Sequence, residues 1–110
     1  MTRQVVTYNE IEGLHRWPDA PAIVSYLRHE HRHVFVIRCW WTVSHNDREI
    51  EIITRANEVE EYLYQTGGRP VAFGALSCEA IAENLMKYFG DSLVKCEVLE
   101  DGFGGASLSR

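Results

Sequence analysis

The feature that most constrains the fold is an uninterrupted run of strand-forming residues from position 31 to position 44. The run contains no glycine or proline and is rich in β-branched and aromatic side chains, which suit a pleated, half-buried surface. It is therefore predicted to be one long strand. Alternate residues of a strand point to the same side, and the apolar side of this one carries Phe35, Ile37, Cys39, Trp41 and Val43.

Shorter segments of similar character are predicted to extend the sheet. They are residues 5–14, 49–53, 94–98 and 106–108. Pro18 and Pro21 end the first strand, because proline removes a backbone donor. The polar group at residues 45–48 predicts a turn, so that the segment after it returns as the hairpin partner of the long strand. A glycine-rich stretch at residues 102–105 predicts a tight turn before the last strand.

Two segments between these strands change to the period of a helix. The first has Asn57 as its expected N-cap, carries Val59 and Leu63 on one face, and ends at Gly67–Gly68. The second begins after the expected N-cap Ser77. The resulting order is ββ(β)ααββ. It predicts an α+β fold in which two helices cover one face of an antiparallel sheet.

Length and composition indicate one domain spanning residues 1–110 and exclude some partners. With 11 Lys and Arg against 16 Asp and Glu, the formal charge is −5, which argues against nucleic acid as a partner. No apolar stretch is long enough to span a membrane, and no secretory leader is expected. Cys39, Cys78 and Cys96 are an odd number at wide spacing, which favours a reduced, cytoplasmic location.

Three histidines are placed where they could share a metal ion. His31 and His33 lie two residues apart at the start of the long strand, so both imidazoles project from its apolar face. His15 ends the first strand and can meet them if the two strands are neighbours. Three neutral imidazoles with one open position are what a catalytic zinc ion requires. The alternative is two surface histidines and one core histidine within a cationic turn.

Four stretches resemble, in order, the family of 6-pyruvoyl-tetrahydropterin synthase and 6-carboxytetrahydropterin synthase. Glu12–Pro18 is similar to the segment with the family's first zinc-binding histidine, and His31–Ile37 is similar to the His-x-His that opens its second strand. Leu76–Glu79 resembles the start of the family's second helix. Val98–Asp101 resembles the strand that bears its pterin-holding glutamate.

The resemblance implies a tunnelling fold (T-fold), in which subunits join side by side into a homo-oligomeric barrel with sites at the subunit boundaries. It implies that His15, His31 and His33 hold Zn²⁺. It also implies that Glu100 anchors the ring of a pterin- or purine-like ligand. The substrate class would be a dihydroneopterin triphosphate, and the activity that of a lyase.

Four residues near the expected ligand have physical arguments of their own. Glu100 continues the apolar side of its strand, and a carboxylate there must be paired or must contact a ligand. An arginine partner, a backbone partner or an edge position are the alternatives. Ser77, Cys78 and Glu79 stand at a helix N-terminus, which favours anions and can lower the pKa of a thiol. They are candidate substrate contacts, and a simple capping motif is the alternative.

The sequence also departs from the family's pattern. Tyr26–Arg28 occupies the region where the synthases place a catalytic cysteine, and residues 56–76 lack the family's Asp-His pair. Arg32 replaces the glycine between the paired histidines. Proton transfer needs a titratable group within reach, and Cys78 is the one candidate replacement. Two functions therefore stay open, a zinc-dependent pterin-synthase-like enzyme and a catalytically inactive T-fold module that binds a ligand or builds an oligomer.

Overall fold

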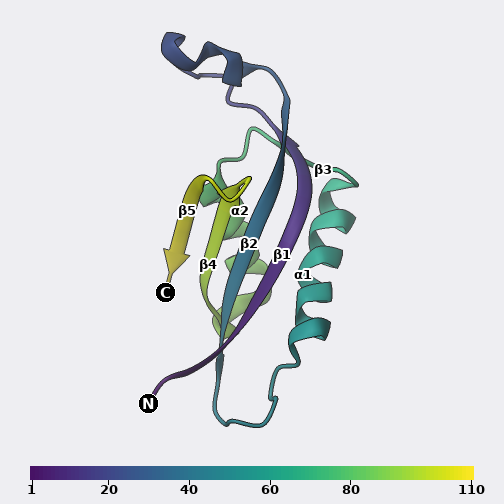
Figure 1. Ribbon diagram of the computed structural model, residues 1–110, viewed down its shortest axis with the longest axis vertical. Coiled ribbons are helices and arrows are strands. Elements are labelled where there is room, and N and C mark those ends of the chain that lie inside the picture. The colour runs from purple at the N-terminus through teal and green to yellow at the C-terminus, as the bar shows by residue number, and fades with distance from the viewer.

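The computed structural model describes all 110 residues and has an α+β architecture, with one mixed five-stranded sheet. The strand order is β3-β1-β2-β4-β5 (Figure 1). The strands are β1 (Arg3–His15), β2 (His31–Val43), β3 (Val71–Gly74), β4 (Leu93–Glu100) and β5 (Gly104–Ser109). The helices are α1 (Ile52–Gly67) and α2 (Cys78–Phe89), with 3-10 turns η1 (Ala22–Arg28) and η2 (Gly90–Ser92).

The long strand predicted from the sequence is β2, and it forms the centre of the sheet. It pairs with β1 along an antiparallel ladder that runs from Arg3 opposite Val43 to His15 opposite His31. On its other edge it pairs with β4, from Trp41 opposite Leu93 to Phe35 opposite Glu100. The two longest strands thus bring the beginning of the chain against residues 31–43.

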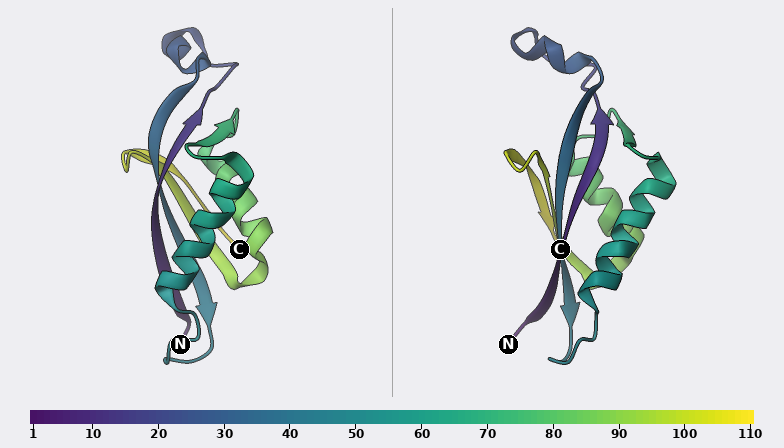
Figure 2. Two further views of the ribbon diagram at one scale, coloured as in Figure 1. Left: turned by 90° about the vertical axis from the view of Figure 1, so that its right-hand side faces the viewer. Right: turned by 45° about the vertical axis from the view of Figure 1, so that its right-hand side comes forward.

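Both α-helices pack on one face of the sheet, as the sequence predicted (Figure 2). The core lies between these layers and consists of 17 buried residues. Those that are completely buried include Ile11, Phe35, Ile37, Cys39, Trp41, Val59, Leu85, Cys96 and Val98. Burying one such large apolar side chain contributes about 1.5–3 kcal/mol, so this layer fixes which face of β2 points inward.

The β1–β2 hairpin extends past the helical layer and ends in η1, which projects from the body (Figures 1 and 2). No residue of η1 is buried. Ile23 and Tyr26 in η1, and Trp17 before it, are exposed. The histidine-bearing ends of β1 and β2 lie at the base of this projection. None of the helices is both long and apolar enough to cross a membrane.

The start of α1 corrects two predictions. Residues 49–53 do not return as a strand, because β4 occupies the free edge of β2. The helix begins at Ile52 rather than after Asn57, because Glu51 is the N-cap. The Glu51 carboxylate accepts hydrogen bonds from the backbone N–H groups of Ile53 and Thr54, both at 2.8 Å. These contacts satisfy two amides that the first turn would leave without partners.

The sheet is mixed rather than antiparallel, because it contains a strand, β3, that the sequence did not predict. This four-residue strand runs parallel to β1, with Gly13 opposite Val71, and is too short to show a clear alternation. The N-cap of α2 was predicted correctly, since the Ser77 hydroxyl accepts the N–H of Ala80 at 3.1 Å. Through β3 and the loop after it, the chain returns to the end of β1 before α2 begins.

Candidate metal centre

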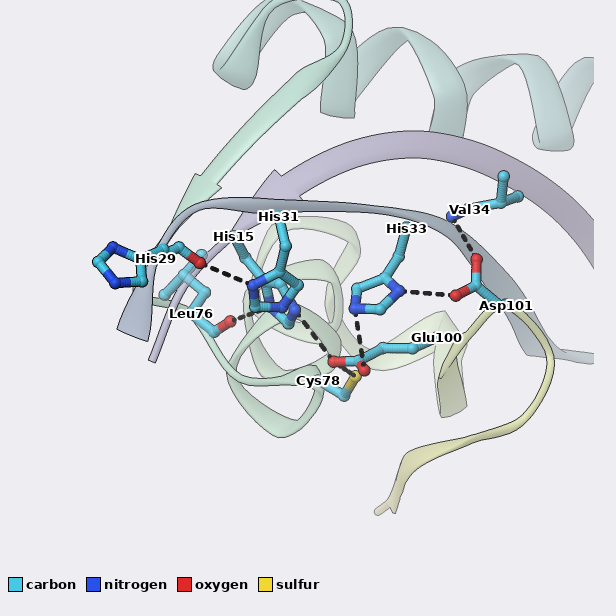
Figure 3. A network of polar contacts seen from close by, with 9 residues as sticks. All are labelled: His15, His29, His31, His33, Val34, Leu76, Cys78, Glu100 and Asp101. Carbon is cyan, nitrogen blue, oxygen red and sulfur yellow. Dashed lines mark hydrogen bonds and ion pairs between the residues drawn. The ribbon is translucent and has the colours of Figure 1, made fainter. Parts of the chain in front are cut away.

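Three imidazoles meet where β1 ends and β2 begins (Figure 3). His15 and His31 are direct partners in the ladder, and His33 is the next residue of β2 on the same face. The ring centroids lie 4.6 Å apart for His15 and His31, 5.3 Å for His15 and His33, and 4.9 Å for His31 and His33. One ligand atom from each ring lies within 4.8 Å of the others. The convergence predicted from the sequence is therefore confirmed.

Each ring has an oxygen acceptor beside its Nδ1 atom. The acceptor is the Leu76 carbonyl for His15 at 3.2 Å and the His29 carbonyl for His31 at 2.8 Å. For His33 it is the Asp101 carboxylate, at 2.6 Å. An Nδ1 atom beside an acceptor carries the hydrogen, which leaves the lone pair on Nε2. All three imidazoles therefore have the tautomer in which Nε2 can bind a metal ion.

The Glu100 carboxylate lies against the free side of two of these rings. Its Oε1 atom is 3.1 Å from Nε2 of His15, and its Oε2 atom is 3.4 Å from Nε2 of His33. Both Nε2 atoms are buried and neither has a hydrogen-bond partner. The Nε2 lone pairs and the carboxylate oxygens repel each other when neither a proton nor a cation lies between them. This arrangement therefore favours a cation at the centre. Imidazole and carboxylate are ligands that Zn²⁺ accepts, and the residues fit that ion.

Burial keeps the first of these histidines neutral. The pKa of His15 is lowered, chiefly because burial removes water from its ring. Charge repulsion with the nearby His31 and His33 makes a smaller contribution to the lowering. A neutral imidazole is the form that binds a metal ion. The cluster is therefore prepared for a cation by burial as well as by the orientation of its rings.

Asp101 supports His33 and was not singled out in the sequence analysis. It has a positive φ of 54° and follows the last residue of β4. Its backbone N–H donates to the Val34 carbonyl at 2.7 Å, and its Oδ1 atom accepts the Val34 N–H at 2.9 Å. These bonds hold the second oxygen against His33, and the Val34 N–H is the main cause of the lowered pKa of Asp101. The Asp-Gly pair after a strand was the available signal, because aspartate tolerates this backbone conformation.

Two phenylalanines form an apolar floor beneath the imidazoles. The ring of Phe35 packs edge-on against His15 and His33, with centroid distances of 5.2 and 5.8 Å. Phe73 packs against Phe35 at 4.8 Å. Gly13 makes this packing possible, because a Cβ atom there would lie 2.5 Å from Cε2 of Phe73. The floor shields one side of the cluster from water and holds the rings in place.

Of the three candidate residues at the start of α2, only Cys78 reaches the cluster. Its thiol donates to Oε1 of Glu100 at 3.8 Å. Burial, and next the charge of Glu100, raise the pKa of Cys78 to about 12, opposite to the direction expected from the helix terminus. Ser77 caps the helix and Glu79 is exposed. Neither makes a hydrogen bond or ion pair with the three histidines.

Comparison with known proteins adds no relative: no family model matches the chain, and no curated protein matches it. The fold and the site together define an α+β protein with a cluster of three histidines that could bind a metal ion.

Proposed function

We propose that this protein is a zinc protein of the pterin-synthase type, with His15, His31 and His33 as the metal ligands. The observation that carries the proposal is the common orientation of the three rings: each Nδ1 atom faces an acceptor, and the Nε2 atoms of His15 and His33 are buried without a partner. A bound Zn²⁺ would supply a Lewis acid that polarises a hydroxyl or carbonyl oxygen of the ligand.

The proposed ligand is a pterin- or purine-like ring of the dihydroneopterin triphosphate class, which the resemblance implies. Glu100 is suited to the ring, because a carboxylate accepts hydrogen bonds from adjacent amino and ring N–H groups. Its side chain is 34% exposed, so a ligand can reach it.

We also propose the T-fold and its homo-oligomeric barrel. Both helices cover one face of the sheet, and β3 and β5 form its two edges. β5 is six residues long and carries no charged side chain, so its edge lacks the devices that prevent strand pairing between chains. A second copy of the chain could extend the sheet at such an edge.

A second candidate function is a binding module of the same fold without catalysis. The specific observation in its favour is the lack of a suitable proton-transfer group: the Cys78 thiol, which contacts Glu100, is protonated at neutral pH because its pKa is raised to about 12. General acid–base catalysis works best with a group whose pKa lies near the operating pH. Binding of metal and ligand without turnover is the outcome that this site favours.

Elemental analysis of the purified protein tests the metal. We expect zinc to copurify with the wild-type chain and to be lost from a variant that combines His31→Ala and His33→Ala. The remaining histidines, His29 and His45, are matched controls: His29→Ala keeps the backbone carbonyl that His31 uses, and His45 is exposed at the other end of the hairpin. Equal zinc in the double variant and the wild type would refute the proposal.

Incubation of the zinc-loaded protein with dihydroneopterin triphosphate then separates the two functions. Formation of a tetrahydropterin product would establish the enzyme. Saturable binding of this compound with no product would establish the binding module, and the absence of both would exclude this ligand class.

A further inference from the structure

The carboxylate of Glu100 lies against the Nε2 atoms of two of the three histidines, where a further metal ligand would lie. Its two oxygens lie 3.1 and 3.4 Å from Nε2 of His15 and Nε2 of His33. Ligand atoms bound to a tetrahedral zinc ion at about 2.0–2.1 Å lie about 3.3 Å from each other. Each oxygen of Glu100 therefore lies at about the separation that two ligands of one ion have, Oε1 from His15 and Oε2 from His33.

Alternative explanations for this proximity do not fit the contacts. A hydrogen bond would need a second proton on each ring, at Nε2, because Nδ1 of His15 already faces the Leu76 carbonyl and Nδ1 of His33 the Asp101 carboxylate. Neither Nε2 atom makes a hydrogen bond. No arginine or lysine forms an ion pair with Glu100, whose only ion-pair partners are these two histidines. A cation between the three side chains accounts for all of these contacts.

We infer that Glu100 is a fourth metal ligand, which closes the centre formed by the three histidines. The inference rests on the proposed function, since it needs that centre to bind a metal ion. It adds a ligand-exchange step to that function, because a ring that hydrogen-bonds to this carboxylate must first displace it from the ion. The 34% exposure of the Glu100 side chain allows this displacement without opening the core.

Cobalt(II) tests the inference, because its visible absorption reports the number and the kind of its ligands. The probe is the metal alone, added to metal-free protein. The wild type should show the intense band of four-coordinate cobalt. Glu100→Ala should weaken cobalt binding at least tenfold and change the position and intensity of the band, because water replaces the carboxylate as a ligand. Glu97→Gln is the control, since Glu97 lies on the same strand and pairs with Arg38 on the protein surface.

Glu100→Asp separates coordination from charge. It keeps the negative charge but is one methylene shorter, so a ligand role predicts weak binding and an altered band, as in Glu100→Ala. Wild-type affinity in Glu100→Asp would show that only charge matters, and a wild-type spectrum in Glu100→Ala would show that Glu100 is not a ligand. Either result overturns the inference. If His31→Ala with His33→Ala binds cobalt as the wild type does, the proposed function fails instead. Circular dichroism of the metal-free variants shows whether they are folded.

Discussion

Replacing Asp101 by asparagine tests whether the second carboxylate at this site controls the tautomer of His33. The aspartate uses one oxygen for the Val34 N–H at 2.9 Å and the other for Nδ1 of His33 at 2.6 Å. Asparagine has one oxygen and one NH₂ group. If the oxygen stays on Val34, the NH₂ group donates to Nδ1 of His33. The imidazole proton must then move to Nε2, which removes His33 from the ligand set.

The expected magnitude follows from the role of such partners. Losing a group that orients a metal-bound histidine costs about 10–100-fold in metal affinity, which corresponds to about 1.4–2.7 kcal/mol. The Asp101 side chain is 55% exposed, so water can satisfy the freed groups in the metal-free protein. We therefore expect weaker zinc binding with little change in the melting temperature of the metal-free protein.

Competition with a chromophoric chelator at neutral pH measures the zinc dissociation constant. Asp91→Asn is the matched control, because Asp91 is an exposed aspartate in η2. Equal dissociation constants for Asp101→Asn and the wild type would refute the tautomer argument. A fall in metal-free stability large enough to explain the weaker binding would refute it as well.

Three further predictions concern stability. Thr7→Val removes the acceptor of the buried Trp41 indole N–H, now at 2.9 Å, and should lower the free energy of unfolding in urea by about 1–3 kcal/mol. Gly13→Ala places a Cβ atom 2.5 Å from the Phe73 ring, so it should destabilise the protein by about 1–3 kcal/mol and weaken zinc binding. Burial lowers the pKa of His15 below its usual 6.5. Below that pH the unfolded chain therefore binds more protons than the folded one. The melting temperature of the metal-free protein should fall with decreasing pH there, and fall less in His15→Gln.

Each of these predictions has a result that contradicts it. Unchanged urea unfolding of Thr7→Val would show that the indole N–H finds another partner, and the exposed Thr42→Val is the control. Wild-type stability and zinc affinity in Gly13→Ala would show that the aromatic floor can shift. An equal pH dependence in His15→Gln and the wild type would assign the effect to other groups.

Much of the fold was predictable because burial leaves a pattern in the chain. The alternation in residues 31–43 specified the central strand and the face that carries Phe35 and Trp41. Ser77 was recognisable as a cap because its side chain acts within one turn. The N-cap at Glu51 was missed, because the short alternation at residues 49–53 was interpreted as a strand.

The cluster of three histidines was predictable from the sequence, but the groups that orient its rings were not. The two-residue periodicity of a strand placed His31 and His33 on one face, and pairing with the end of β1 added His15. The acceptors that orient the first two rings are the backbone carbonyls of Leu76 and His29. Every residue has a carbonyl group, so no sequence pattern marks the ones that a fold will use.

His15 pairs directly with His31, so metal binding at the cluster would depend on the correct assembly of the hairpin. A shift of β1 by one residue would turn its alternate side chains to the opposite face of the sheet, and His15 would leave the cluster. A cation that needs all three imidazoles would therefore bind only the native alignment, and it would stabilise that alignment over the shifted ones. The bound ion would then shift the equilibrium toward the correctly paired hairpin.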